Sequence, residues 1–110
     1  MKKLLLAAST LLLALQPAAA PAQAVHDYKT MFDILQDGTR PCLFFKLNGV
    51  TTADPAVAGE WFAVPRYHLA FAEVFALIVT ARTLNLTVRV TTNGATSCGV
   101  ATVDTIYIRG

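Results

Sequence analysis

The sequence predicts a small α+β domain that is mostly β: a five-stranded barrel with one apolar helix, in the order β-β-β-α-β-β. Short segments in which apolar and polar residues alternate, as in half-buried strands, lie on both sides of a single long apolar segment. Clusters of Gly, Pro, Asn and Asp separate these segments and are typical of turns. Setting aside the first 24 of the 110 residues as a targeting segment leaves 86, which is enough for one domain.

The first 24 residues have the three-part layout of a secretory signal peptide. Lys2 and Lys3 precede an apolar run over residues 4–15, and Ala22-Gln23-Ala24 places small residues at the two positions that a signal peptidase recognises. The alternative, a membrane anchor, is disfavoured because the run is too short to span a bilayer and lacks a stop-transfer flank. The sequence therefore predicts export to the periplasm or the medium, with a single domain over residues 25–110.

The exported part has no net charge. Of the nine Lys and Arg residues, two lie in the targeting segment, so seven remain against seven Asp and Glu. A neutral domain gives no indication of a nucleic-acid partner or of an anionic membrane surface.

The two cysteines, Cys42 and Cys98, both lie in the exported part, where an oxidising compartment favours their pairing. A bond between them closes a loop of more than fifty residues and, in the chain-entropy model, stabilises the fold by about 4 kcal/mol. The alternative, a redox or metal pair, is disfavoured because there is no CxxC spacing and only His26 and His68 offer other soft ligands. We expect a structural disulfide and no metal or cofactor.

Three strands are expected before the helix, spanning residues 25–36, 42–48 and 60–64. Asp37-Gly38-Thr39-Arg40-Pro41 predicts a turn between the first two, which therefore form a hairpin. In the second strand, Leu43, Phe45 and Leu47 share one face, and Cys42, Phe44 and Lys46 share the other. A loop over residues 48–59 leads to the third strand.

Residues 66–84 predict the one helix, with Pro65 at its first turn. Its broad apolar face contains Phe71, Val74, Phe75 and Ile78. The opposite polar stripe is narrow, and a helix that is apolar nearly all round is buried on more than one side. The second side is expected to face either another copy of the chain or the interior of its own fold, and the sequence leaves both open.

Two strands are expected after the helix, over residues 86–92 and 99–109. Asn85 predicts the end of the helix, and Asn93-Gly94 predicts a turn between the strands. In the last strand the apolar alternation changes face in the middle, which predicts a β-bulge near Asp104-Thr105 or a strand that serves two sheets.

Five short strands with one helix after the third have the strand count and helix position of an OB-fold. That fold is a small Greek-key barrel, here with the helix plugging one end. A plain sandwich of one sheet and one helix is the alternative.

A pattern in the second half of the chain resembles a known family. It consists of Trp-Phe-Ala-Val-Pro at 61–65, the apolar helix over 67–82, Leu-Thr-Val-Arg-Val at 86–90, Cys-Gly-Val at 98–100 and Thr-Ile-Tyr-Ile at 105–108. It is similar to the B subunits of bacterial toxins of the pertussis-like, subtilase-cytotoxin and typhoid-toxin type, and to related small secreted bacterial proteins. The resemblance implies an OB-fold, a homo-oligomeric ring with helices at its centre, and binding of host glycans.

No constellation in the sequence predicts catalysis. His68 has no acid or nucleophile at a suitable spacing, and Ser97 lacks the G-x-S-x-G elbow. Asp54 and Glu60 are loop acids without a patterned partner. The sequence therefore predicts that the protein is not an enzyme.

Three residues are candidate ligand contacts: Trp61, Arg66 and Tyr67. The two aromatic rings match the apolar face of a sugar, and Arg66 follows a proline that fixes its backbone. The alternatives are that Trp61 packs in the core and that Arg66 is a solvated charge; if Phe62 and Val64 face inward, Trp61 and Ala63 face outward. Two functions follow: an oligomeric glycan-binding module, or a monomeric periplasmic domain that binds or inhibits another protein.

Overall fold

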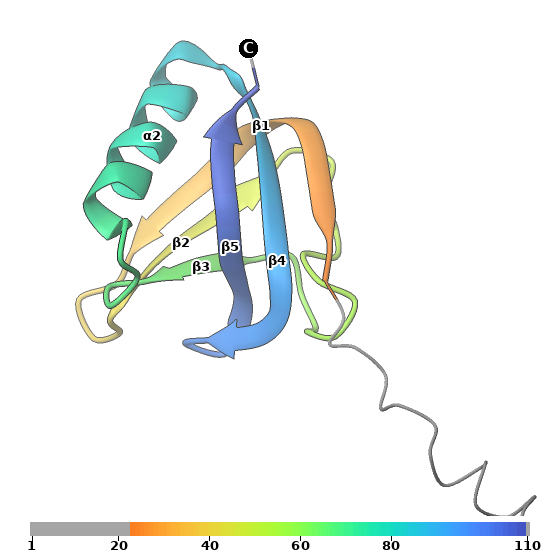
Figure 1. The fold of residues 1–110 in the computed structure, drawn as a ribbon, viewed down its shortest axis with the longest axis vertical. Helices are drawn as coiled ribbons and strands as arrows, with labels where there is room; N and C mark the ends of the chain where they lie inside the picture. The colour runs from red at the N-terminus through yellow and green to blue at the C-terminus, as the bar shows by residue number, and fades with distance from the viewer. Residues whose placement is uncertain (1–22, 110) are drawn as a thin grey trace, which may run out of the picture.

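A computed structural model describes residues 23–109, so all but the last two residues of the predicted signal peptide lie outside the described residues (Figure 1). The elements are β1 (Val25–Gln36), β2 (Cys42–Leu47), β3 (Phe62–Pro65), α2 (Phe71–Leu84), β4 (Thr87–Ser97) and β5 (Val100–Ile108). The predicted order of five strands with a helix after the third is confirmed, and the fold is mostly β.

The five strands form one mixed sheet. β1 pairs with β2 and β4, β2 with β3, and β4 with β5, all antiparallel, whereas β3 and β5 are parallel. The pairing order β1-β2-β3-β5-β4 returns to β1, so the sheet closes on itself. Figure 1 shows α2 lying along one side of this sheet, beside β1 and β5.

The interior of the closed sheet is filled by one face of each strand and by one side of the helix. Its members include Met31 of β1, Leu43, Phe45 and Leu47 of β2, Phe62 and Val64 of β3, Val88 and Val90 of β4, Val103 of β5, and Val74 and Ile78 of α2. Phe45 and Phe62 stack with ring centroids 5.0 Å apart. The prediction that Leu43, Phe45 and Leu47 share one face of β2 is therefore confirmed, and this face points inward.

The opposite face of β2 is also covered. Cys42, Phe44 and Ala63 are buried in a second, smaller cluster, with Trp61, Cys98 and Val100 packed against it. This places Trp61 and Ala63 on the face opposite to Phe62 and Val64, as the alternation along this segment predicts.

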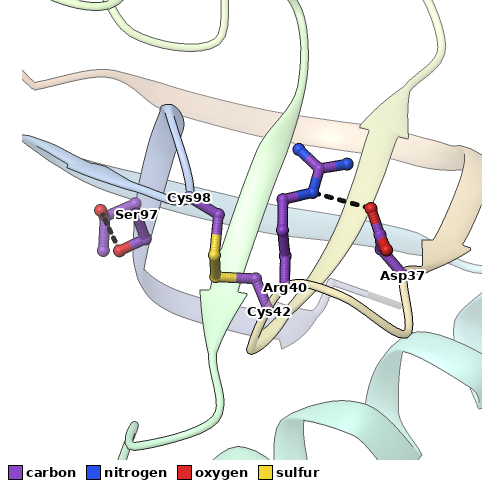
Figure 2. Close-up of a disulfide and its surroundings, with 6 residues drawn as sticks. Asp37, Arg40, Cys42, Ser97 and Cys98 are labelled. Carbon is purple, nitrogen blue, oxygen red and sulfur yellow. Dashed lines mark hydrogen bonds and ion pairs between the residues drawn. A yellow bond between two sulfur atoms is a disulfide. The ribbon is translucent and has the colours of Figure 1, made fainter.

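The predicted disulfide is present between Cys42 and Cys98 (Figure 2). It joins the first residue of β2 to the turn between β4 and β5, elements that are 56 residues apart in the chain. Because these elements are not consecutive, the bond fixes the hairpin of β4 and β5 to the outer face of β2 and β3.

The helix begins later than predicted. Pro65 is the last residue of β3, opposite Cys42, and α2 starts only at Phe71. The N–H of Arg66 donates to the carbonyl of Pro41 at 2.9 Å, which continues the pairing of β3 with the end of the β1–β2 turn. Residues 66–70 therefore form a turn, in which the ring of His68 accepts a hydrogen bond from the N–H of Ala70.

The predicted turn at Asn93-Gly94 is wrong, because β4 continues to Ser97 and the turn lies at Cys98-Gly99. Gly94 has a φ of 81° and lies where the register with β5 shifts, so this pair forms an irregularity inside the strand.

The predicted bulge near Asp104 is confirmed. Thr91 pairs with Thr105 and Thr92 with Val103, which leaves Asp104 unpaired between them. Asn85 ends the helix in the left-handed conformation, as predicted.

Only one side of α2 is buried. Val74, Ile78 and Ala81 face the sheet, whereas Phe75 and Val79 are 42% and 41% exposed. Of the two alternatives left open for the second side, coverage by the chain's own fold is therefore wrong for residues 23–109, because the closed sheet is small and contacts the helix from one side only. No helix in this range is long and apolar enough to span a membrane.

Candidate functional site

Three surface hollows meet around two arginines, Arg40 and Arg66. The first hollow lies beside Trp61, the second beside the turn between β1 and β2, and the third beside the start of α2. Arg40 borders the first and second hollows, and Arg66 borders the second and third. Arg40 belongs to the turn between β1 and β2, and Arg66 follows β3 directly. We call the residues that line the three hollows the Arg40–Arg66 surface.

The first hollow is aromatic and has a volume of about 150 Å³. It is lined by Leu35, Arg40, Phe44, Trp61 and Val100. Phe44 forms a buried floor, Trp61 is half-buried, and Leu35 is 41% exposed at the rim. The guanidinium of Arg40 lies 4.3 Å from the centroid of the Phe44 ring, so a cation and two aromatic rings border the same space.

Arg40 is held in place by the turn in which it lies. Its Nε donates to Asp37 Oδ2 at 2.8 Å (Figure 2), and the N–H and hydroxyl of Thr39 donate to Oδ1 of the same carboxylate. The backbone N–H of Thr39, then its hydroxyl and then Arg40 lower the pKa of Asp37 to about 2. Asp37 engages Nε alone, which leaves the two terminal nitrogens of Arg40 to donate to a ligand.

Trp61 has a fixed cation as its neighbour. Lys46 Nζ lies 5.0 Å from the Trp61 ring and makes ion pairs with Asp33 at 3.2 Å and Glu60 at 3.1 Å. The hydrogen bonds to Glu60 and Asp33 raise the pKa of Lys46, so the ammonium stays charged at neutral pH. This ion-pair group restrains the side of Trp61 that faces β2.

The second and third hollows share Arg66. The second, of about 300 Å³, is bordered by Gly38, Thr39, Arg40, Pro41 and Arg66. The third, of about 430 Å³, is apolar and is bordered by Gln36, Arg66, Phe71, Ala72 and Phe75. Arg66 is exposed, and within residues 23–109 no carboxylate forms an ion pair with it.

The structure brings two of the three predicted contacts to one surface. Trp61 and Arg66 border hollows that meet at Arg40, although they lie at opposite ends of β3. Tyr67 is 81% exposed and lines none of the three hollows. Arg40 was missed by sequence reasoning. The sequence feature that could have indicated Arg40 is its position in the predicted turn, two residues before Cys42, for which a disulfide was expected.

The surface combines three kinds of group that can contact a ligand. It offers aromatic faces, guanidinium donors and an apolar extension, and the carboxylate nearest to Arg40 already accepts three hydrogen bonds. Among the residues that the structure describes, no three His, Cys, Asp or Glu side chains are close enough to hold a metal ion.

No protein-family model matches the chain, and no curated protein matches it.

Proposed function

We propose that this protein is an exported, non-catalytic binding module that recognises a glycan through the Arg40–Arg66 surface. One observation carries the proposal: Trp61, Phe44 and the fixed guanidinium of Arg40 line the same hollow. A pyranose presents an apolar C–H face and a rim of hydroxyl groups. The Trp61 ring matches the face, and the terminal nitrogens of Arg40 match hydroxyl or acidic oxygens.

The position of the hollow on the fold supports this proposal. We propose that the fold is an OB-fold, because the closed five-stranded sheet in the order β1-β2-β3-β5-β4, with a helix between β3 and β4, is compatible with that small barrel. Proteins with this fold bind oligosaccharides and oligonucleotides on the face of strands 2 and 3 and on the adjoining loops. The first hollow lies on that face, and the neutral charge of the exported part favours a saccharide over a nucleic acid.

The toxin B subunits that the second half of the chain resembles act as rings. The exposed side of α2, with Phe75 and Val79, supports assembly of this chain with further copies through the helix. Several weak sites held in one assembly bind a glycan-covered surface far more tightly than one site alone. The proposed module is therefore a homo-oligomer in which the first hollow, beside Arg40 and Trp61, takes the glycan, and the helix, including Phe75 at the border of the third hollow, contacts the neighbouring copies.

Glycan-array screening of the exported protein tests the proposal, followed by titration of the strongest glycan found. Trp61→Ala and Arg40→Gln should each weaken binding about ten-fold, which corresponds to the loss of one good contact. Tyr107→Ala is the matched control, because Tyr107 is an exposed aromatic residue that lines none of the hollows. Thermal unfolding of each variant confirms that it is folded.

The second candidate function is a monomeric periplasmic domain that binds or inhibits another protein. The exposed apolar side of α2 also fits this function, since such a surface suits a foreign protein as well as a second copy. A monomer that gives no signal on the array and retains a specific periplasmic protein in a pull-down would replace the glycan proposal with this one.

A further inference from the structure

Ala24 is built into the closed sheet. Its N–H donates to the hydroxyl of Thr92 at 2.9 Å, and its carbonyl accepts the N–H of Thr92 at 3.0 Å. The register of β1 with β4 pairs Val25 with Thr91, so these two bonds extend that pairing by one residue towards the N-terminus. Ala24 therefore behaves as part of the domain.

The partner of Ala24 is buried and belongs to a larger network. Thr92 is 1% exposed, and its hydroxyl donates in turn to a carboxylate oxygen of Asp54, which is fully buried. The same carboxylate accepts the N–H of Gly94 at 2.9 Å and that of Ala56 at 2.8 Å. The N–H of Ala24 is thus the outer end of a chain of hydrogen bonds that terminates on an interior charge.

Cleavage after Ala24 would remove both of these bonds. The N–H of Thr92, a buried residue, would lose the carbonyl of Ala24 as its acceptor. The hydroxyl of Thr92 would lose the N–H of Ala24 as its donor. Cleavage there would also place a new ammonium group on Val25, inside the pairing of β1 with β4. Unpaired buried N–H groups cost free energy, so the pairing of β1 with β4 is less stable in a chain that begins at Val25.

The sequence offers a second bond with the same small residues around it. Ala20 and Ala22 stand at the third and first positions before the Ala22–Gln23 bond, just as Ala22 and Ala24 do for the Ala24–Val25 bond. We propose that the signal peptidase hydrolyses the Ala22–Gln23 bond, two residues before the cut that the Ala-Gln-Ala motif predicts. Water adds across this bond and yields a carboxylate on Ala22 and an ammonium on Gln23. The inference rests on the proposed export.

The first test is the intact mass of the processed protein. The full chain is expressed in a bacterial host, and the protein is recovered from the periplasm and the medium. We expect a species that begins at Gln23, with or without cyclisation of that glutamine. A species that begins at Val25, or at any other residue, overturns the inference and leaves export standing. A precursor retained unprocessed in the cell overturns both.

Two matched variants of the full chain separate the two bonds. Ala20→Leu blocks recognition of the Ala22–Gln23 bond only, and Ala24→Leu blocks recognition of the Ala24–Val25 bond only while keeping the backbone of Ala24 in place. We expect Ala20→Leu to abolish the species that begins at Gln23, and Ala24→Leu to be processed at Gln23 as the parent is. The reverse pattern, with Ala24→Leu unprocessed and Ala20→Leu unaffected, overturns the inference.

Discussion

At the scale of single residues, the buried carboxylate of Asp54 is the clearest case of a polar group that the fold requires. It accepts hydrogen bonds from the hydroxyl of Thr92 and from the N–H groups of Ala56 and Gly94. It therefore holds the loop between β2 and β3 against β4. The ring of His26 reinforces this contact, because its Nε2 lies 2.8 Å from the carbonyl oxygen of Ala53.

The protonation of Asp54 links this network to pH. Burial by itself raises the pKa of Asp54, but the hydrogen bonds from Thr92, Ala56 and Gly94, with the charge of His26, outweigh it and bring the pKa below the ordinary value of 3.8. A carboxyl group whose pKa is lower in the folded state stabilises the fold at pH values above its unfolded pKa. That contribution is lost as the pH falls through the folded pKa.

Asp54→Asn should lower the free energy of unfolding by about 1–3 kcal/mol at neutral pH, because an amide NH₂ group would face donors in a buried site. The difference between the parent and the variant should shrink as the pH is lowered from about 5 to below the folded pKa, where the parent also loses the carboxylate. Denaturant unfolding over this pH range measures both effects. Asp104→Asn is the control, since Asp104 is exposed; an equal loss in that variant would contradict the role given to Asp54.

At the scale of elements, the disulfide is the main restraint on the face that carries the first hollow. Cys42 and Cys98 belong to the cluster that also contains Phe44 and Trp61, and Val100 follows two residues after Cys98. The bond therefore fixes the start of β5 beside the aromatic floor of the hollow. Its loss should affect both the stability of the fold and the shape of the site.

Cys98→Ser should lower the free energy of unfolding by about 4 kcal/mol under oxidising conditions, the value expected for a loop of this length. Cys98 is the better position to change because Cys42 is 1% exposed, and serine there would also bury a hydroxyl group. Thermal or denaturant unfolding with and without a reductant measures the effect. A reductant should destabilise the parent and leave the variant unchanged, so a variant that unfolds like the parent would contradict a stabilising bond.

The strands were predictable because their side chains alternate between two environments. β1 spans the predicted residues, and alternation alone places Leu43, Phe45 and Leu47 on one face of β2. The helix start and the second turn were not predictable in this way, because each depends on a contact between distant residues. Pro65 stays in the sheet because Arg66 bonds to Pro41, and Gly94 stays in β4 beside the carboxylate of Asp54.

The site was predictable only in part, for the same reason. Trp61 and Arg66 stand out in the sequence as an aromatic residue and a charge that flank a short strand. Arg40 becomes visible only when the hairpin of β1 and β2 is folded and its turn reaches the end of β3. Residues that come together only through strand pairing are far apart in the sequence, so no local pattern predicts that they are neighbours.

At the scale of the whole molecule, the side of α2 that faces away from the sheet is the feature that the single chain leaves unexplained. The helix is apolar nearly all round, yet only Val74, Ile78 and Ala81 are buried. Exposed apolar side chains on one helix face are typical of contacts between protein chains. Assembly through this face would also leave the first hollow, which Arg40 borders and which contains no helix residue, free for a ligand.

Phe75→Glu and Val79→Glu should convert the proposed oligomer to a monomer, because each places a charge in an interface from which water is excluded. Neither change should unfold the chain, since both side chains are about two-fifths exposed and glutamate is a good helix former. Light scattering at micromolar concentration measures the mass, and thermal unfolding monitors the fold. Thr80→Glu is the matched control on the exposed polar stripe and should leave the mass unchanged. A parent protein that is already monomeric would contradict assembly through α2 and favour a different protein as the partner of this face.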